Sequence, residues 1–166
     1  MSFPLIPDLI VPSVTDLTPE FLKSRGVGLL MMDFDNTIVP YTTNTPTAEM
    51  QRWLKGLKEW GIAYCVVSNS KRDRVVKFCK EYGIPCITHS KKPFPKGIRQ
   101  ALRTIEHDGG AALVGDQIYT DVLGANCAGV MSILVTPIHL HNWLLKLRHV
   151  AEKPFIAIGK RRMNHE

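Results

Sequence analysis

An apolar run followed directly by two carboxylates constrains this chain more than any other stretch. Residues 29–32 read LLMM, and residues 33–37 read DFDNT. Apolar runs without alternation are typical of strands that are buried on both faces, as in parallel sheets. Because ligands of open α/β sheets bind at the carboxyl ends of the strands, Asp33 and Asp35 are predicted to lie at a binding site.

The close spacing of these two carboxylates has a physical cost. At a buried strand end, Asp33 and Asp35 would lose hydration and repel each other, so a metal ion or basic groups would be needed to offset their charge. The structural alternative is an N-capping pair at a strand-to-helix turn.

Strand and helix patterns alternate along the chain. We expect strands at about residues 27–33, 62–67, 84–88, 111–115 and 130–135, and helices at about 46–60, 71–82, 95–107 and up to 128. This alternation is typical of βαβ units with right-handed crossovers. The predicted fold is therefore α/β, with a parallel sheet of five or more strands and helices on both faces.

The length of 166 residues fits one domain with a substantial core. We divide it into an N-terminal extension packed on the core (1–26), a catalytic core (27–137) and a basic, amphipathic tail of the same domain (138–166). The connections between residues 37 and 68 and between 70 and 91 are too short for a large cap domain. The predicted site is therefore open.

Composition limits the partners and the compartment. The chain has 21 basic and 15 acidic residues, so its formal charge of +6 favours phosphorylated or anionic partners. The four cysteines form no CxxC pair, which fits reduced thiols in the cytosol. There is no basic region typical of a signal peptide, and no run of about 18 apolar residues. We expect a cytoplasmic protein, with peripheral contact at the inner membrane surface as a further expectation.

Polar side chains follow four of the predicted strands, and in a parallel sheet these strand ends face one crevice. Taken singly, each group has an ordinary explanation, such as a helix cap for residues 68–70 or a solvated loop lysine for Lys92. Their coincidence at successive strand ends predicts a site. The groups are Asp33 with Asp35, Ser68 with Asn69 and Ser70, Lys91 with Lys92, and Asp116 with Asp121.

These residues resemble the four motifs of the haloacid dehalogenase superfamily. The DxDxT pattern at 33–37 is similar to the first motif, Ser68 to the second, Lys92 or Lys91 to the third, and the GDxxxTD pattern at 115–121 to the fourth. The lead-in, the two acidic boxes and the basic tail further resemble the YqeG family of class IIIA phosphatases. That family is similar to phosphatidylglycerophosphate phosphatases.

The resemblance implies a catalytic role for each motif. Asp33 would be the nucleophile and form an aspartyl-phosphate, and Asp35 would protonate the leaving alkoxide and then activate water. Lys92 would bind phosphoryl oxygens and offset the carboxylates. The remaining residues of the implied substrate site are Ser68, Asn69 and Thr37, of which Asn69 could instead cap a helix and Thr37 would hold the turn that aims Asp35.

The resemblance also implies Mg²⁺ as the cofactor. Asp116, Asp33 and the backbone carbonyl of Asp35 would hold the ion, because oxygen ligands and a substrate phosphate suit a hard cation. Asp121 would support the metal indirectly or orient Lys92.

The expected reaction is phosphomonoester hydrolysis, because a second acid at Asp35 suits protonation of an ester oxygen. The open site and the tail favour an anionic lipid head group, with phosphatidylglycerophosphate as the implied substrate. The tail combines apolar residues such as Trp143, Leu147 and Val150 with several cations. The tail could equally be a helix packed on the sheet with a solvated basic end.

Three alternatives remain at this stage. The first is a phosphatase for a soluble nucleotide, sugar or protein phosphate. The second is a receiver domain, but its acceptor Asp comes later in the chain than the DxDxT pattern found here. The third is a non-enzymatic phosphate- or RNA-binding module, although no aromatic-rich RNA motif is present, so nucleic acid is not the expected partner.

Overall fold

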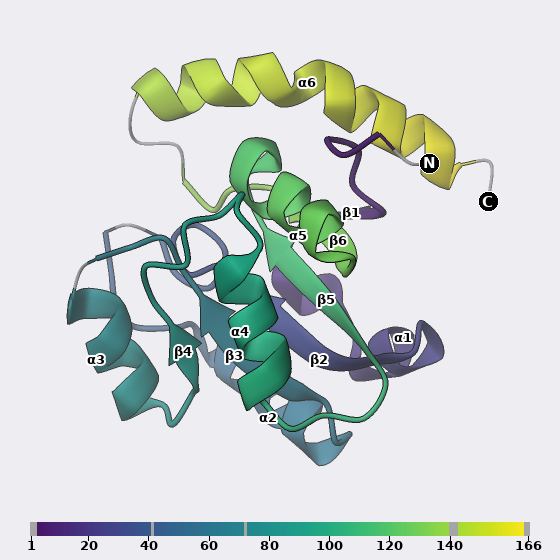
Figure 1. Ribbon diagram of the computed structural model, residues 1–166. Coiled ribbons are helices and arrows are strands. Elements are labelled where there is room, and N and C mark those ends of the chain that lie inside the picture. The colour runs from purple at the N-terminus through teal and green to yellow at the C-terminus, as the bar shows by residue number, and fades with distance from the viewer. Residues whose placement is uncertain (1–2, 41, 72, 140–142, 165–166) are drawn as a thin grey trace.

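The computed structural model describes residues 3–40, 42–71, 73–139 and 143–164, with side chains from Lys146 onward in the last range. The side chain of Trp143 therefore lies outside the described part. Six parallel strands form one sheet in the order β1-β6-β5-β2-β3-β4 (Figure 1). The strands are β1 (Leu9–Val11), β2 (Val27–Met32), β3 (Ala63–Val67), β4 (Cys86–Ile87), β5 (Gly110–Gly115) and β6 (Met131–Val135).

Strand β2 lies inside the sheet and is buried along its whole length, as its apolar run predicts. Successive side chains of a strand point to opposite faces. Leu30 and Met32 accordingly join one hydrophobic core, whereas Leu29 and Met31 join the other. A strand with two buried faces places its carboxyl end, and so Asp33, in the middle of one edge of the sheet.

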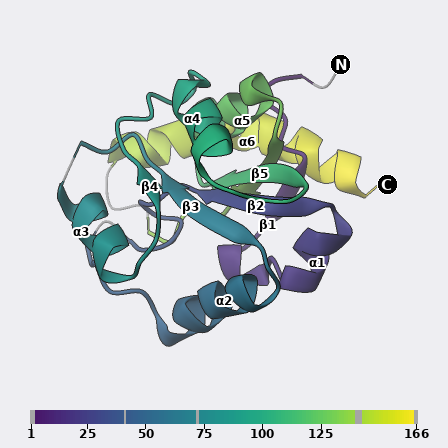
Figure 2. The ribbon, with the colours of Figure 1, turned by 60° about the horizontal axis from the view of Figure 1, so that its bottom comes forward.

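Helices cover both faces of the sheet, as predicted (Figure 2). Residues of α1 (Pro19–Ser24), α2 (Ala48–Glu59) and α3 (Asp73–Glu81) belong to the larger core on one face. Residues of α4 (Lys96–Thr104) and α5 (Leu123–Ala128) belong to the core on the other face. The molecule is thus a three-layer α/β fold with a parallel sheet.

Local signals set the ends of several helices close to their predicted bounds. The Thr47 hydroxyl accepts a hydrogen bond from the Met50 amide at 3.1 Å and caps α2. Gly129 ends α5 in the left-handed conformation, with a φ of 75°. Between β5 and α5 the chain forms a π-helical turn, η2 (Ile118–Val122), which the sequence pattern did not predict.

The N-terminal segment contains regular secondary structure, whereas the sequence predicted an extended lead-in. Residues Leu9–Val11 form the edge strand β1, which pairs in parallel with β6. A 3₁₀ turn, η1 (Val14–Asp16), follows, and its Val14 joins the larger core. The sequence prediction missed β1 because a three-residue strand between prolines shows no periodicity.

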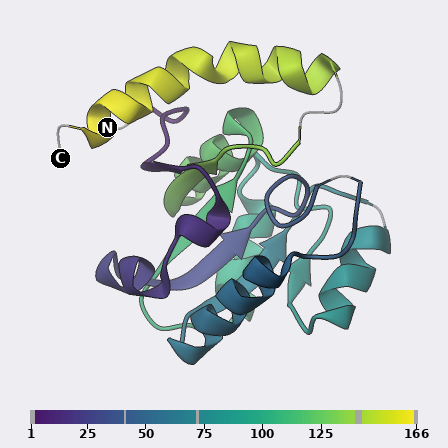
Figure 3. The same ribbon diagram turned by 180° about the vertical axis from the view of Figure 1, so that it is seen from behind.

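Helix α6 (Trp143–Met163) lies across the carboxyl edge of the sheet, above β1 and β6 (Figures 1 and 3). Phe155 and Ile156 of α6 pack against a small cluster that includes Leu134 of β6. Leu147 and Val150, two apolar residues of the tail, are 59% and 54% exposed. No helix among the described residues is long and apolar enough to cross a lipid bilayer.

Candidate active site

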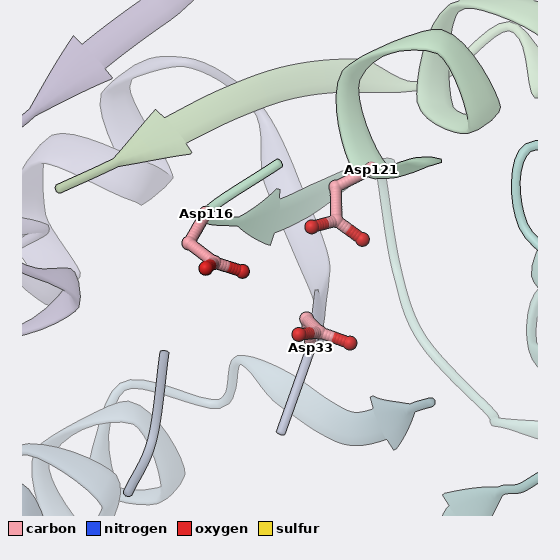
Figure 4. Close-up of side chains that lie close together, drawn as sticks. All are labelled: Asp33, Asp116 and Asp121. Carbon is pink, nitrogen blue, oxygen red and sulfur yellow. The ribbon is translucent and has the colours of Figure 1, made fainter. Parts of the chain in front are cut away.

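Three carboxylates meet at the carboxyl edge of the sheet. Asp33 follows β2, Asp116 follows β5, and Asp121 lies in η2; Figure 4 shows their side chains pointing toward one another. One oxygen from each carboxylate lies within 4.8 Å of the others. Strands β2 and β5 are neighbours in the sheet, and the Asp33 amide donates to the Val114 carbonyl at 2.9 Å, which holds the two strand ends in register.

Lys92 is the cation that reaches this cluster. Its Nζ donates to Asp33 Oδ1 and to Asp121 Oδ1, at 2.7 Å each, and its side chain is 1% exposed. Burial alone would lower the pKa of Lys92, but Asp121 and Asp33 raise it overall, so the ammonium keeps its charge. Lys91 is exposed and lines a different cavity, so Lys92 is the lysine that the fold brings to the carboxylates.

Burial disfavours the ionised forms of the Asp33 and Asp116 carboxylates. Burial raises the pKa of Asp33 from 3.8 to about 7; Lys92 lowers it in part, whereas the neighbouring Asp121 raises it further. Burial also raises the pKa of Asp116 well above its ordinary value, and Asp33 and Asp121 add to this effect. Among the residues that the structure describes, Asp116 Oδ1 has no hydrogen-bond partner.

Asp121 is fixed against the end of β5. Its Oδ2 accepts a hydrogen bond from the Gln117 amide at 3.1 Å, and its Oδ1 accepts from Lys92. A Cβ at Gly115 would overlap the Asp121 carboxylate, so only glycine leaves room for it at the strand end. Of the two roles expected for Asp121, the contacts match orientation of Lys92.

The residues after β3 hold the loop that carries Lys92. Asn69 Oδ1 accepts from Ser90 Oγ and from the Lys92 amide, at 2.7 Å each, and Asn69 Nδ2 donates to the Lys92 carbonyl at 2.8 Å. Asn69 thus ties two loops together, whereas the phosphate contact and the helix cap considered for it stay predictions. The buried Ser68 hydroxyl accepts from the Ser70 amide at 3.1 Å.

Arg74 of α3 contacts the second carboxylate of the DxDxT pattern. Its Nη1 donates to Asp35 Oδ1 at 2.7 Å, and its Nη2 donates to the carbonyls of Pro40 and Thr43 at 2.7 and 2.8 Å. The guanidinium also lies 5.0 Å from the centroid of the Phe34 ring. Arg74 therefore links the helix to the whole turn around Asp35. No sequence pattern signals this contact, because an arginine early in a helix is ordinary.

Backbone contacts shape the turn that carries Asp35. The Ile38 amide donates to the Phe34 carbonyl at 3.1 Å, and the Asn36 amide donates to the Val39 carbonyl at 2.8 Å. Thr37 is buried, but its hydroxyl has no hydrogen-bond partner among the described residues. The threonine thus contributes to the packing of the turn, whereas main-chain hydrogen bonds set its shape.

A cavity of about 370 Å³ opens beside these groups. Its size falls in the range of small-ligand sites, about 300–1,000 Å³. It brings together five of the eight site residues predicted from the sequence, whereas Thr37, Asp116 and Asp121 do not line it. The lining consists of Asp33, Asp35, Ser68, Asn69, Ser70, Lys71, Lys92, Gln117 and Thr120.

Comparisons with known proteins agree with this geometry. Residues 3–138 match a family model described as mitochondrial PGP phosphatase. The "Probable phosphatase YqeG" of Bacillus subtilis (strain 168) is 34% identical over 159 residues, which cover 95% of this chain and 92% of that protein.

Two solved structures are more distantly similar. A hypothetical protein from Xanthomonas campestris has a TM-score of 0.49 and 16% identity, covering 82% of this chain and 79% of that one. A glycerol phosphate phosphatase from Mycobacterium tuberculosis, solved in complex with calcium, has a TM-score of 0.26 and 16% identity, covering 75% and 48%. Both similarities are too weak to assign a function.

The parallel α/β fold and the family match define the class of protein: the chain is a phosphatase of the haloacid dehalogenase type. Within that class it belongs to the family described as mitochondrial PGP phosphatase and is related to YqeG along nearly its whole length. The motif resemblance seen in the sequence is thereby confirmed at the level of the family.

Proposed function

We propose that this protein is a Mg²⁺-dependent hydrolase that cleaves a phosphomonoester through an aspartyl-phosphate on Asp33, and that its substrate is phosphatidylglycerophosphate. One observation carries the chemical part of this proposal. A single buried ammonium, Lys92, bridges Asp33 and Asp121 at 2.7 Å each, while the Asp116 carboxylate nearby has no cation partner among the described residues.

The residues present fit a divalent cation. Three carboxylates share a small volume with one ammonium, and a buried oxygen of Asp116 has no hydrogen-bond partner among the described residues. A hard cation with oxygen ligands would satisfy that oxygen and offset the remaining charge. Asp33, Asp116 and the backbone carbonyl of Asp35 would hold it. When bound, the ion would neutralise charge on the phosphoryl oxygens.

The proposed reaction has two steps. In the first, an oxygen of Asp33 attacks phosphorus, the bond to the ester oxygen breaks, and Asp35 gives its proton to the departing alkoxide. In the second, Asp35 takes a proton from water, whose oxygen attacks phosphorus and releases phosphate and the free Asp33 carboxylate. Lys92 and the Ser68 hydroxyl would bind the phosphoryl oxygens, whose charge develops in both steps.

The surroundings support a distinct task for each of the paired aspartates. Asp33 faces Lys92, which favours the carboxylate form that a nucleophile needs. Asp35 is held instead by Arg74, which also binds the carbonyls of Pro40 and Thr43. This contact would hold Asp35 in place where it lines the catalytic cavity.

The substrate part of the proposal rests on other observations. The matched family model is described as a PGP phosphatase. The cavity at Asp33 lies at the edge of the sheet without a cap domain in the described residues, so a bulky ester could reach it. The formal charge of +6 favours an anionic substrate or surface.

The test is phosphate release by the full chain from phosphatidylglycerophosphate in anionic vesicles. Soluble sugar, nucleotide and peptide phosphates would be compared under the same conditions, each with Mg²⁺ and with EDTA. We expect Mg²⁺-dependent release that is fastest from the lipid. If a soluble phosphate turns over much faster, the lipid assignment is wrong and the phosphatase acts on a soluble substrate.

A further inference from the structure

A second cavity, of about 340 Å³, lies between α6 and the end of the sheet formed by β1 and β6. We call it the α6 groove. Its floor is apolar and comes from three elements that are far apart in sequence. The apolar floor consists of Ile10 of β1, Leu134 and Val135 of β6, and Ile156 of α6.

Basic side chains line the α6 side of the groove. Lys153 and Lys160 are exposed, and His149 lies one turn before Lys153. Residues spaced by four and seven positions share one side of a helix. Among the described residues that line the groove, only Asp116 is acidic. The groove thus combines an apolar floor with a basic wall.

Asp116 connects the α6 groove to the catalytic carboxylates. It lines the groove, and its carboxylate also belongs to the cluster with Asp33 and Asp121. The following residue, Gln117, lines the catalytic cavity, and its side-chain oxygen accepts a hydrogen bond from Arg148 of α6. Helix α6 therefore lines the α6 groove and, through Arg148, contacts a residue that lines the catalytic cavity.

We propose that the α6 groove is a second substrate subsite, which binds a further anion and the adjoining aliphatic part of the leaving group. Lys153 and Lys160 bind that anion, of the phosphodiester type, and the apolar floor takes the first methylenes of an acyl chain that glycerol joins to it. This inference rests on the proposed phosphatase function, because it places the reacting phosphate at Asp33. It makes α6 the element that selects the substrate.

Steady-state kinetics of the full chain with Mg²⁺ test this with three esters. p-Nitrophenyl phosphate has no second anion, glycerophosphoglycerophosphate has the anion without acyl chains, and dihexanoyl phosphatidylglycerophosphate, used as monomers, has both. In the double variant Lys153→Ala/Lys160→Ala, we expect KM for the two esters with a second anion to rise about tenfold or more. Their kcat, and both constants for p-nitrophenyl phosphate, should change less than twofold.

A second variant tests the apolar floor. Ala157 lines the α6 groove at an exposed position, so Ala157→Phe would place a ring in the space proposed for the methylenes. We expect it to lower kcat/KM about tenfold for the acylated ester and much less for the deacylated one. An equal loss for both esters would mean that no aliphatic chain binds there.

The matched control removes the same charge from the same helix. Lys146 and Arg161 are exposed and line neither cavity, so Lys146→Ala/Arg161→Ala should leave all constants within twofold of the wild type. If this control matches the groove variant, general attraction by a basic helix explains the effect and the subsite is wrong. The subsite is also wrong if the groove variant affects p-nitrophenyl phosphate as strongly as the other esters, or affects none.

Binding of a product analogue separates this inference from the proposed function. Dihexanoyl phosphatidylglycerol keeps the second anion and the chains but has no reacting phosphate. Calorimetry should show that its Kd rises about tenfold in Lys153→Ala/Lys160→Ala. If no phosphomonoester is hydrolysed but this difference holds, the proposed function fails and the groove stands. If both proteins bind the analogue equally or not at all, the groove assignment is overturned.

Discussion

At the scale of single residues, the carboxylates of the site outnumber the cations that contact them. One ammonium, Lys92, contacts two carboxylates, and a third carboxylate, Asp116, is buried beside them. Burial disfavours the charged forms of Asp33 and Asp116, and the neighbouring carboxylates add to this effect. The site is thus expected to bind an additional cation. It should bind the negatively charged phosphate only when that cation is present.

Asp33→Asn tests the nucleophile. An amide does not form the acyl-phosphate that the first step requires, so phosphate release should fall by at least about 10⁴-fold. The measurement is phosphate release with Mg²⁺ at saturating substrate, with circular dichroism as the control for folding. Activity close to that of the wild type would contradict the assignment.

Asp35→Asn tests the acid–base role. The variant should still bind phosphate, because Lys92 and Ser68 are unchanged, but turnover should fall about 10²–10⁴-fold. The loss should be smaller for p-nitrophenyl phosphate, whose leaving group needs no proton. Arg74→Lys is a useful partner, since it keeps the charge but not the forked contacts to Asp35, Pro40 and Thr43. Equal losses on alkyl and aryl esters would argue against proton transfer by Asp35.

Asp116→Asn tests the metal site. The substitution keeps the shape of the side chain but removes its charge, so the Mg²⁺ concentration for half-maximal activity should rise at least about tenfold. A Mg²⁺ titration of phosphate release measures this, and EDTA should abolish activity of the wild type. An unchanged Mg²⁺ requirement would place the ion elsewhere.

At the scale of elements, α6 is joined to the catalytic turn by a buried acid. Glu152 is 2% exposed, and its Oε1 accepts a hydrogen bond from the Ile118 amide at 2.9 Å, at the start of η2. The preceding Gln117 amide donates to Asp121, which in turn contacts Lys92. The position of α6 is therefore coupled to the turn that supports the carboxylates.

Glu152→Ala should lower the free energy of unfolding by about 1–3 kcal/mol, because the buried Ile118 amide loses its acceptor. Glu152→Gln keeps an acceptor oxygen, and it removes a carboxylate that has its pKa raised by burial. It should therefore lower the free energy of unfolding much less than Glu152→Ala. Urea unfolding compares the two variants. A truncation after Pro137 is a poorer test, since it would also expose Leu134 and its neighbours. Equal destabilisation by alanine and glutamine would contradict the role of the hydrogen bond.

At the scale of the whole molecule, the carboxylate cluster should make stability depend on pH. Burial raises the pKa of Asp33 from 3.8 to about 7, and it raises the pKa of Asp116 in the same direction. An acid with a raised pKa in the folded state favours folding while it is protonated. Its contribution is therefore lost as pH rises from about 4 through about 7.

Without metal, Asp33→Asn should thus become more stable relative to the wild type as pH rises. We expect a relative gain on the order of 2 kcal/mol between pH 5 and pH 8, measured by urea unfolding in EDTA. Mg²⁺ should stabilise the wild type more at pH 8 than at pH 5, because it binds the deprotonated carboxylates. Parallel pH profiles for the two proteins in EDTA would contradict this account.

The sequence by itself determined the class of fold and most of the site. The apolar run at 29–32 is typical of a strand buried on both faces, and β2 is such a strand. Since parallel strands point the same way, the polar groups after four strands had to gather at one edge. Asp33, Ser68 and Lys92 accordingly line one cavity.

The tertiary structure alone decided how these residues are paired. Lys92 and Lys91 are equivalent in the sequence, and the loop tied by Asn69 brings Lys92 to Asp33, which is 59 positions away. Arg74 reaches Asp35 across 39 positions, with no local pattern to signal it. Strand β1 pairs with β6 through main-chain hydrogen bonds, which leave little trace in side-chain periodicity. Local patterns specify elements, whereas contacts between distant residues depend on how those elements pack.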